Sequence, residues 1–539
     1  MTDRWTPSQL ARPIRWVLAL EYGGGTWYLS DVAMTIDDGA GGTIVVSDGL
    51  LDVSGGEETI DLWNTDAPVR SVAVEFDLGI DVAALVEQGH DLAGTTAELA
   101  QLADGDAWTD RRPFAVGRMS EPQYGGLGES VKASVEQDVL IDETAEITVT
   151  TLTYQEFGAA IEQVSTLVRA TTRNPSFTAP VVIGTPGDGN WGATWAAKTD
   201  IFNDSVTLDW YDLWVIAGHP VAATSITLVA EDGTSDSLPV KQITMPSGII
   251  ISYVEVNLSI PVPAWTNTSP TMSVKWDDGP GLIDQTSNSY TTAGDYIAWL
   301  LSLTQQSIDQ GKVNHAREQL AAFKVSTYID ETVTVADYVR EAVLEIVPVS
   351  FIAGPKGLYP YVWKWDATEQ DAVAHLDVTT DVDISRETLV TYENSGEICN
   401  KLTIQYARNP TTDSYTAEII ASGAPRPPRT TAFYADWWSD SVLARSFARY
   451  GTKSDTLECA NVYDRTTAAH IAAWKSRRWA LPSRVVEYSC DQRWGWIEPG
   501  DFITMTDPDL AWNKKLCLVQ SRGWDEDGTV RYALRVQEL

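Results

Sequence analysis

Residues 494–536 read WGWIEPGDFITMTDPDLAWNKKLCLVQSRGWDEDGTVRYALRV, and this stretch decides the fold class. A Pro499-Gly500-Asp501 turn precedes an apolar, threonine-rich run that starts at Phe502 and predicts a strand. A second apolar run follows, and Asp527-Gly528 then predicts a tight hairpin because glycine accepts a positive φ. Apolar and polar residues alternate over 530–536, after that turn. The stretch is therefore predicted to be a three-stranded antiparallel β-meander.

Short strands of the same kind recur in two other parts of the chain. Near the start, WVLALEY at 16–22 and TWYLSDVAM at 26–34 are separated by glycines. Farther along, LDWYDLWVIAG at 208–218 and IISYVEVNLSI at 250–260 lie between turn sequences. Many short strands at regular spacing are typical of β-sandwiches and β-barrels.

The sequence also predicts a minority of helices. Two capping pairs, at 292–295 and 334–337, open segments with apolar residues at helical spacing. Helices are further predicted at 439–450 and 467–479, and a short one within 82–102. The predicted fold class is therefore mainly β with α+β portions. It has barrel or sandwich domains and a small helical α/β module before the C-terminal β-meander.

A chain of 539 residues is too long for one core, since domains average about 150 residues. The predicted domain boundaries lie where the pattern of predicted secondary structure changes and where turn residues are frequent. They are a first β-barrel-like domain at 1–135, a connecting segment at 136–180, a β-sandwich-like module at 181–285 that is a candidate insertion, an α/β module at 286–397, and a C-terminal β domain with two helices at 398–539.

The net charge of the chain limits the classes of partner that it can bind. Lys and Arg total 38 against 75 Asp and Glu, which gives a net charge of −37. Such a charge repels phosphate groups, so the sequence argues against direct sequence-specific nucleic-acid binding and against anionic membrane surfaces. No apolar run is long enough to span a membrane and no export signal is seen, so synthesis in a cytoplasm is expected. The 22 Trp and 20 Tyr favour extensive subunit contacts.

The motifs that would signal an enzyme are missing from the sequence. It contains no G-x-S-x-G, no complete glycine-rich phosphate loop and no H-E-x-x-H, and its five histidines are scattered. We therefore predict that the chain is not an enzyme. A glycoside hydrolase is the enzyme alternative, but 75 acidic residues offer no way to choose its two carboxylates.

Four cysteines, Cys399, Cys459, Cys490 and Cys517, lie in the last part of the chain, and none forms a C-x-x-C pair. Widely spaced cysteines beside predicted strands are usually buried small apolar residues. No cofactor is therefore predicted. The alternative is that the four thiols together hold zinc or an iron–sulfur cluster.

Several phrases of the sequence, in this order, resemble phage tail hub proteins, the baseplate-hub-like proteins at the tip of a long tail. They are FAVGRMSEPQYGGLGESVKASVEQ at 114–137, the Pro-apolar-Gly phrase at 180–187, the helix–helix–strand order after 292, the Arg- and Trp-bearing helix at 467–479, and the closing meander. The resemblance implies a homotrimer in which each subunit contributes two barrel-like domains. Three copies would then present six similar surfaces to a sixfold tail tube.

The resemblance also implies a place and partners. The chain would be a structural virion protein at the tail tip, made in the host cytoplasm. It would bind copies of itself, the tail tube or distal tail protein, and tail-tip and fibre proteins. The implied docking strands of the first barrel span 27–34 and 117–135, and the interface candidates in them are Trp27, Tyr28, Met34, Arg118 and Tyr124.

A second interpretation concerns the 181–285 module. Its aromatic cluster of Trp210, Tyr211 and Trp214 is a candidate contact for a host-surface glycan, because flat rings stack on sugars. In that case the chain would be a receptor-binding tail protein. The competing interpretation is that these three residues belong to a sandwich core.

Overall fold

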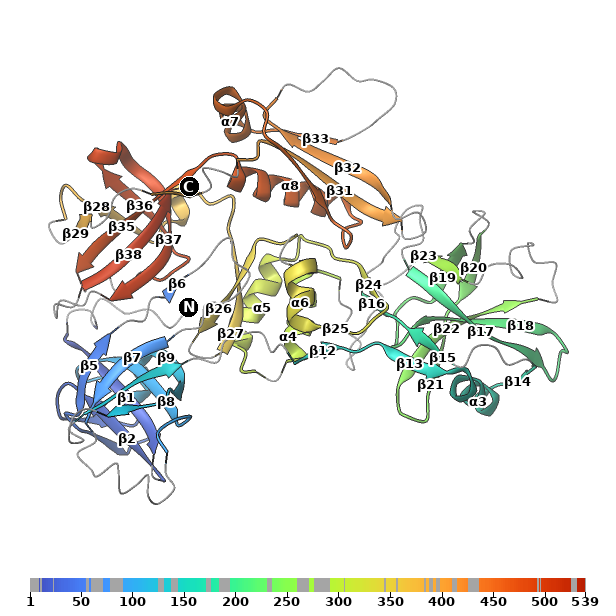
Figure 1. The fold of residues 1–539 in the computed structure, drawn as a ribbon, viewed down its shortest axis with the longest axis horizontal. Coiled ribbons are helices and arrows are strands. Elements are labelled where there is room, and N and C mark those ends of the chain that lie inside the picture. The colour runs from blue at the N-terminus through green and yellow to red at the C-terminus, as the bar shows by residue number, and fades with distance from the viewer. Residues whose placement is uncertain are drawn as a thin grey trace.

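In the computed structural model the chain is elongated, with two β units at one end, an α/β centre, and a further β module at the other end (Figure 1). The fold is mainly β, as the sequence predicts. The structure describes residues 9, 12–22, 24–54, 58–59, 71–77, 91–124, 130–136, 144–170, 176–183, 194–229, 235–258, 271–275, 291–304, 306–343, 346–354, 357–381, 384–386, 391–393, 398–409, 414–424, 436–491, 494, 496–524 and 531–538.

The first sheet curls into a nearly closed barrel. Its strand order is β2-β1-β8-β9-β11-β7-β5, with β10 paired to β11. The strands are β1 (Ile14–Tyr22), β2 (Gly25–Ser30), β5 (Leu50–Ser54), β7 (Ser71–Phe76), β8 (Thr96–Ala103), β9 (Arg112–Met119), β10 (Gln123–Tyr124) and β11 (Val131–Glu136). At the seam Leu29 bridges Ser47, just before β5, and the Ser30 N–H donates to the Ser47 carbonyl at 2.8 Å. Leu18 and Phe76 are among the apolar side chains that fill the interior.

A hairpin covers the outside of this barrel. It consists of β3 (Met34–Asp37) and β4 (Thr43–Val46), and it packs with the short helix η1 (Trp108–Asp110) against the outer face of β1. Val17 and Ala19 alternate with the inward-facing residues of β1 and contact Ile36 and Trp108 in this outer core. Strand β1 is therefore apolar on both faces because both faces are buried.

The last part of the segment 82–102, in which a short helix is predicted, is not helical. Residues 96–102 belong to β8, which pairs with β1 and β9, while residues 78–90 lie outside the described residues. Ala and Leu favour helices in isolation, but Ala97 and Leu99 alternate on the barrel core here, and tertiary packing overrides a weak local preference.

The last sheet contains the predicted meander, in which β36, β37 and β38 pair in sequence order as antiparallel strands. The sheet order is β28-β36-β37-β38-β35-β29, with β30 on β35. The elements are β28 (Ala374–Asp377), β29 (Ile384–Arg386), β30 (Thr391–Glu393), β35 (Ser483–Asp491), β36 (Phe502–Asp507), η7 (Pro508–Leu510), β37 (Trp512–Trp524) and β38 (Arg531–Glu538). The hairpin predicted at 527–528 lies outside the described residues.

The turn before β36 needs its glycine. Gly500 has φ of +90°, and a Cβ there would lie 2.5 Å from the Tyr361 ring. The Tyr361 hydroxyl donates to the Gly500 carbonyl at 2.6 Å. The turn predicted at 499–501 is thus held against the hairpin that contains Tyr361.

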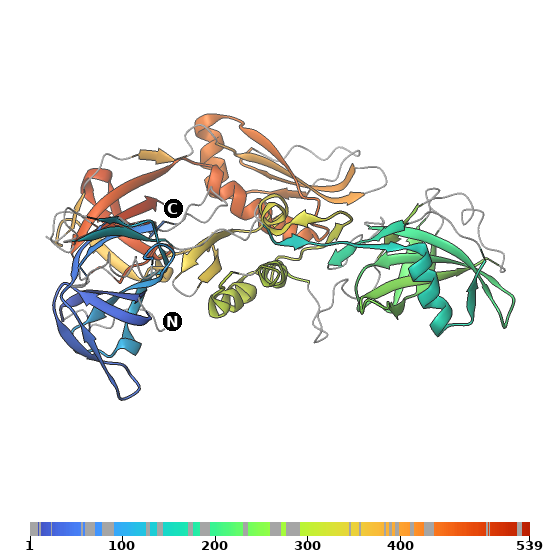
Figure 2. The ribbon, with the colours of Figure 1, turned by 60° about the horizontal axis from the view of Figure 1, so that its bottom comes forward.

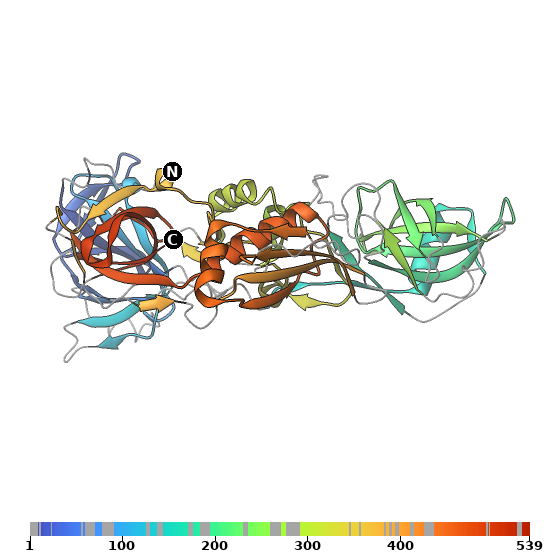
Figure 3. The ribbon, with the colours of Figure 1, turned by 90° about the horizontal axis from the view of Figure 1, so that it is seen from above.

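The first and last sheets are joined although they come from distant parts of the sequence. Strand β6 (Glu58–Thr59), which belongs to the first unit in sequence, pairs with β37 of the last sheet. In addition, Arg112 of β9 forms an ion pair with Glu498, and the two side chains are 12% and 29% exposed. Figures 2 and 3 also show the two units side by side at the same end of the molecule.

The centre combines short helices with short strand pairs. The elements are α4 (Ala293–Ser302), α5 (Gln310–Gln319), α6 (Val335–Tyr338) with a π-helical turn (Val339–Val343), the hairpin of β26 (Val349–Gly354) and β27 (Gly357–Val362), η5 (Glu369–Asp371), β12 (Glu146–Ile147) on β25 (Val333–Thr334), and β16 (Val181–Ile183) on β24 (Thr327–Ile329). Both predicted capping pairs are confirmed: the Asp295 and Asp337 N–H groups donate to Thr292 and Thr334 Oγ1, each at 3.2 Å.

A four-stranded sheet lies against the centre, in the order β33-β32-β31-β34. Its elements are β31 (Lys401–Asn409), β32 (Ser414–Ser422), β33 (Asp436–Trp438), β34 (Ser454–Glu458), α7 (Ser441–Tyr450) and α8 (Arg465–Trp479). The two helices predicted at 439–450 and 467–479 are confirmed to within two residues. Leu301, Ile404 and Ile471 share one core, so this sheet and the centre fold as one apolar unit. In the described part of the chain, no helix is long and apolar enough to cross a membrane.

The module at the other end is a single curled sheet with a core on each face. Its order is β20-β19-β23-β17-β18-β22-β21, with β14 on β17. The strands are β14 (Leu167–Arg169), β17 (Thr194–Asp204), β18 (Trp210–Ala217), β19 (Ser225–Val229), β20 (Ser235–Pro239), β21 (Lys241–Thr244), β22 (Ile250–Asn257) and β23 (Thr271–Lys275). Helix α3 (Tyr154–Val164) and the pair β13 (Thr150–Thr153) and β15 (Ser176–Ala179) cover one face through Phe157, Ile161 and Phe177. The segment 136–180, predicted as a connection, therefore supplies part of this module.

The side chain of His219 binds the backbone at Val182, where the chain enters the module. Its Nε2 accepts the Val182 N–H at 2.9 Å, and its Nδ1 lies 2.8 Å from the Pro220 carbonyl, to which it donates in that tautomer. Burial lowers the pKa of His219 to about 4, although the Pro220 carbonyl opposes the shift. The imidazole is therefore neutral in the folded chain at pH values where an unfolded histidine is charged.

We predict that His219 makes the module lose stability in mild acid. Its stabilising contribution is fully present above about pH 6.5 and is lost as the pH falls through about 4, because only the unfolded chain binds the proton in that window. The loss approaches about 1.4 kcal/mol for each pH unit. Hydrogen exchange at the Val182 amide measures it. His219→Gln, which keeps an acceptor, should flatten the pH dependence, and His315→Gln on exposed α5 should not. An unchanged profile in His219→Gln would contradict the assignment.

Candidate functional site

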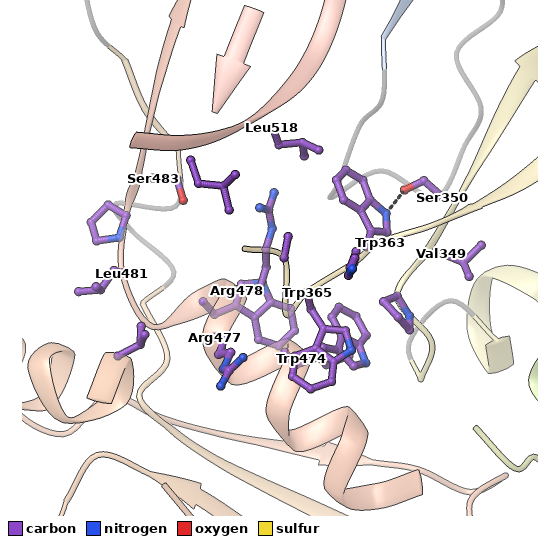
Figure 4. Close-up of a pocket in the computed structure, with 18 of the residues that line it drawn as sticks. Val349, Ser350, Trp363, Trp365, Trp474, Arg477, Arg478, Leu481, Ser483 and Leu518 are labelled. Carbon is purple, nitrogen blue, oxygen red and sulfur yellow. Dashed lines mark hydrogen bonds between the residues drawn. The ribbon is translucent and has the colours of Figure 1, made fainter. Parts of the chain in front are cut away.

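A cleft of about 1090 Å³ lies where three parts of the fold meet. Residues around β26 and β27 line one side, α7 and α8 line another, and the start of β35 with parts of β36 and β37 completes it. Figure 4 shows Trp363, Trp365, Arg477 and Arg478 among the residues that line this space.

The cleft is strongly basic in a strongly acidic chain. Nine of the chain's 38 Lys and Arg residues line it, with one acidic residue, Asp455. The nine cations are Arg340, Lys364, Arg445, Arg449, Lys475, Arg477, Arg478, Arg484 and Lys515. Four tryptophans line the cleft as well: Trp363, Trp365, Trp474 and Trp479. We refer to this site as the basic cleft.

Helix α8 places the charges at the middle of the cleft. Asp464 caps its first turn by accepting the Thr467 N–H at 2.9 Å, and Ile471 is fully buried in the central core. Lys475, Arg477 and Arg478 then fall in its last turns. Cations at the C-terminal end of a helix are favoured by the helix dipole, so the sequence places these charges where the backbone stabilises them.

Aromatic rings hold the cations of α8 in place. The Arg477 guanidinium lies 5.2 Å from the Trp365 ring centre and 5.9 Å from that of Trp438. Arg478 lies 5.8 Å from the Trp363 ring centre. Cation–π contacts of this kind contribute roughly 0.5–1 kcal/mol each at exposed sites and more when water is excluded. Rings from the centre and from the four-stranded sheet are thus tied to one helix.

Hydrogen bonds fix the same residues. Arg477 Nε donates to Asp440 Oδ2 at 2.8 Å, and Asp440 Oδ1 accepts the N–H groups of the first turn of α7. Arg478 Nη2 donates to Gln537 Oε1, in β38, at 2.9 Å. Trp363 Nε1 donates to Ser350 Oγ at 3.0 Å. The end of α8 therefore contacts the centre, helix α7 and the last sheet at once.

Helix α7 contributes the exposed charges of the basic cleft. Arg445 and Arg449 are four residues apart, and therefore lie on one face of the helix, and both are exposed. Arg340, Lys364 and Arg477, by contrast, form ion pairs with Asp337, Asp371 and Asp440. Arg445 and Arg449 are thus the lining cations best placed to meet an incoming anion.

The interface candidates of the first barrel do not share one exposed face. Trp27 pairs with Leu20 and packs on the barrel interior, whereas Tyr28 faces outward against Trp108, with ring centres 5.3 Å apart. Met34 packs into the same outer core. Arg118 is exposed, and its Nη1 donates to the Gly94 carbonyl at 3.3 Å. Tyr124 pairs with Val131 through its backbone, and its side chain lies outside the described residues.

The proposed glycan cluster is also divided. Trp214 is completely buried in one core of the module, and Tyr211 packs against the core on the opposite face. Trp210 is 47% exposed. Because side chains alternate along β18, three residues at these positions cannot form one stacking surface, and the structure corrects that prediction for Trp214.

A different exposed surface lies at that end of the module. Val168, Asn203 and Trp210 are direct neighbours across β14, β17 and β18, so their side chains share a face. Val206 and Leu208, in the turn between β17 and β18, are 73% and 71% exposed, and Leu208 has φ of +63°. We refer to Val168, Val206, Leu208 and Trp210 as the apolar tip.

The four thiols fall into two separate cores. Cys399 and Cys459 belong to the central core, and Cys490 and Cys517 belong to the core of the last sheet. All four are buried, and none of them forms a disulfide. The structure does not bring them together as one metal site, because β31 and its neighbours fold apart from the meander.

The sequence did contain a signal for the basic cleft. Residues 474–479 read WKSRRW, which places three cations between two tryptophans in a chain of net charge −37. The spacing of apolar residues predicts this helix, but it does not predict that the helix lines a cleft. The aromatic partners, Trp363 and Trp365, come from a segment more than 100 residues earlier, and pattern alone cannot pair them with α8.

Comparison with known proteins adds two structural likenesses. No protein-family model matches the sequence, and no curated protein matches it. The structure is similar to the 43 kDa tail protein of prophage MuSo2 from Shewanella oneidensis, with 10% identity and a TM-score of 0.31 over 96% of each chain. It is also similar to a chain of the virion of a native gene transfer agent particle, with 11% identity and a TM-score of 0.34 over 70% of this chain and 88% of that chain. At these TM-scores neither likeness establishes a shared fold or function.

We predict that Arg477 stabilises the junction of the three parts that meet at the cleft. Arg477→Met keeps the aliphatic stem but removes the ion pair with Asp440 and both ring contacts. The free energy of unfolding should fall by about 1–2 kcal/mol in urea titrations followed by tryptophan fluorescence. Arg445→Met, on exposed α7, is the matched control and should change stability by less than about 0.5 kcal/mol. Equal losses in the two variants would show that the ring contacts are not structural.

Proposed function

We propose that this chain is a structural phage tail protein, acting as a hub at the tail tip between the tail tube and distal tip or fibre components. The proposal rests on binding between proteins and assigns no catalytic step. Its support from the sequence is the ordered set of phrases that resemble tail hub proteins.

One structural observation carries the proposal. Two curled β units from distant parts of the chain are held side by side by the β6–β37 pairing and by the Arg112–Glu498 ion pair. A subunit with two such units, repeated three times about an axis, presents six β surfaces. With six similar surfaces, a threefold tip could make the same contact with each of the six subunits in a ring of the tail tube.

The proposal predicts assembly that depends on the relative placement of the two units. Light scattering should give three times the monomer mass, negative-stain images should show a threefold ring, and the tail tube protein of the same particle should bind to it. Arg112→Glu should weaken tube binding, since it opposes Glu498 with a like charge. The swap Arg112→Glu with Glu498→Arg should recover it.

Three results would count against this function. The chain could remain a monomer, it could ignore the tube protein, or the charge swap could bind as poorly as Arg112→Glu alone. Hydrolysis of a host glycan by the purified chain would instead favour the glycosidase alternative.

A second candidate function concerns the apolar tip of the outer module. A group of exposed apolar side chains, with Leu208 held in a left-handed conformation, is typical of a binding surface. Three of its four residues are aliphatic, which fits a protein partner such as a tail fibre better than a glycan, because sugars need aromatic stacking surfaces.

The apolar tip predicts a specific loss of fibre binding. Leu208→Asp should weaken binding of the full chain to the tail fibre protein by at least about tenfold in calorimetry, since it places a charge in the apolar contact. Leu303→Asp replaces another exposed leucine, far along the chain after α4, and should have no effect. Undiminished binding by Leu208→Asp would remove the tip as a fibre site.

A further inference from the structure

We propose that the basic cleft receives a carboxylate-rich segment of a second copy of the same chain. This inference rests on the self-association in the proposed function and names the chemistry of one contact within it. The cleft is formed by described residues of the centre, the four-stranded sheet and the last sheet.

The overall charge of the chain favours such a contact. Each copy carries a net charge of −37, so two copies repel each other at any distance shorter than the screening length. A contact in which positive charge on one copy meets negative charge on the next offsets part of this repulsion. The basic cleft concentrates nine of the 38 Lys and Arg residues around one acidic residue, and each neighbouring copy carries 75 Asp and Glu residues.

The side chains at the cleft suit carboxylates. Arg445 and Arg449 are exposed on one face of α7, one helical turn apart. A planar guanidinium donates two parallel hydrogen bonds to a carboxylate, and two arginines at this spacing can bind two carboxylates of one segment. The cleft volume of about 1090 Å³ is at the upper end of ordinary ligand pockets, so a short stretch of polypeptide fits better than a folded domain.

The same contacts argue against a single strand of nucleic acid. Binding of that kind relies on bases stacking on aromatic side chains. The Trp365 and Trp363 rings are already in contact with Arg477 and Arg478, and Lys475 Nζ lies 4.8 Å from the ring centre of Trp479 and 5.1 Å from that of Trp474. The four rings support the cations in the structure, and the chain's net charge of −37 would repel the rest of a long strand.

The first arm of the test measures carboxylate binding directly. A fluorescent decapeptide of glutamate is titrated with the full chain at 50 mM and 500 mM NaCl. We expect binding that weakens with salt, and a loss of at least about tenfold in affinity for Arg445→Glu. Lys324→Glu is the matched control, because it makes the same charge change at an exposed lysine that does not line the cleft. Equal losses in the two variants would overturn the site.

The second arm measures self-association of the same proteins by sedimentation velocity. The wild-type chain and Lys324→Glu should form the same oligomer, and Arg445→Glu should shift toward monomer, with an apparent dissociation constant raised by about tenfold or more. Circular dichroism and the thermal midpoint should match among the three proteins, since Arg445 is an exposed helix residue.

The possible outcomes separate the two levels of the proposal. If the wild type forms trimers and Arg445→Glu does so equally well, the second copy is not the occupant, while the hub function stands. If the wild type is a monomer under all conditions, the hub function fails and the inference fails with it. If a single-stranded DNA 20-mer displaces the decapeptide at a lower concentration than the free decapeptide does, the ligand class is wrong.

Discussion

The contacts made by the end of α8 are the constraint on which the rest of the structure depends. Arg477 and Arg478 reach tryptophans of the centre, while Asp440 and Gln537 bind the same two arginines from α7 and β38. A cation in contact with aromatic rings and a carboxylate is stabilised by cation–π attraction and by charge-assisted hydrogen bonds. The geometry of the basic cleft follows directly from this junction.

The distribution of charge at this junction also bears on the proposed contact between copies of the chain. Among the described residues, Asp212, Asp501 and Asp507 are the buried carboxylates, while positive side chains gather where three units meet. In the proposed contact, binding within the chain and binding between copies would use neighbouring residues of one cluster. Arg477 is used internally through Asp440, whereas Arg445 and Arg449 remain on the exposed face of α7. A single basic region can serve both purposes because its members differ in burial.

Much of the fold could be predicted from local sequence, and the failures have physical causes. The capping pairs at Thr292 and Thr334, the closing meander and helix α8 follow from turn chemistry and periodicity. Residues 96–102, the last part of the segment predicted to hold a short helix, form strand β8 because pairing with β1 and β9 decides their conformation. In the aromatic cluster, strand alternation places Tyr211 on the opposite face from Trp214, and Trp214 is buried whereas Trp210 is exposed. The basic cleft was missed because its rings and cations are far apart in sequence, and composition carries no information on which distant residues meet.

The pairing of β6 with β37 has a consequence for how the molecule is made. Thr59 and Ser521 are partners across about 460 residues of sequence, and Arg112 and Glu498 are 386 residues apart. During synthesis the first barrel emerges long before β37 exists, so it folds while β6 has no partner strand. Closing so large a loop is slow, which makes this docking step a late event of chain maturation. Until the ribosome has released the last strands, the nascent barrel exposes a short unpaired segment to chaperones and to neighbouring chains.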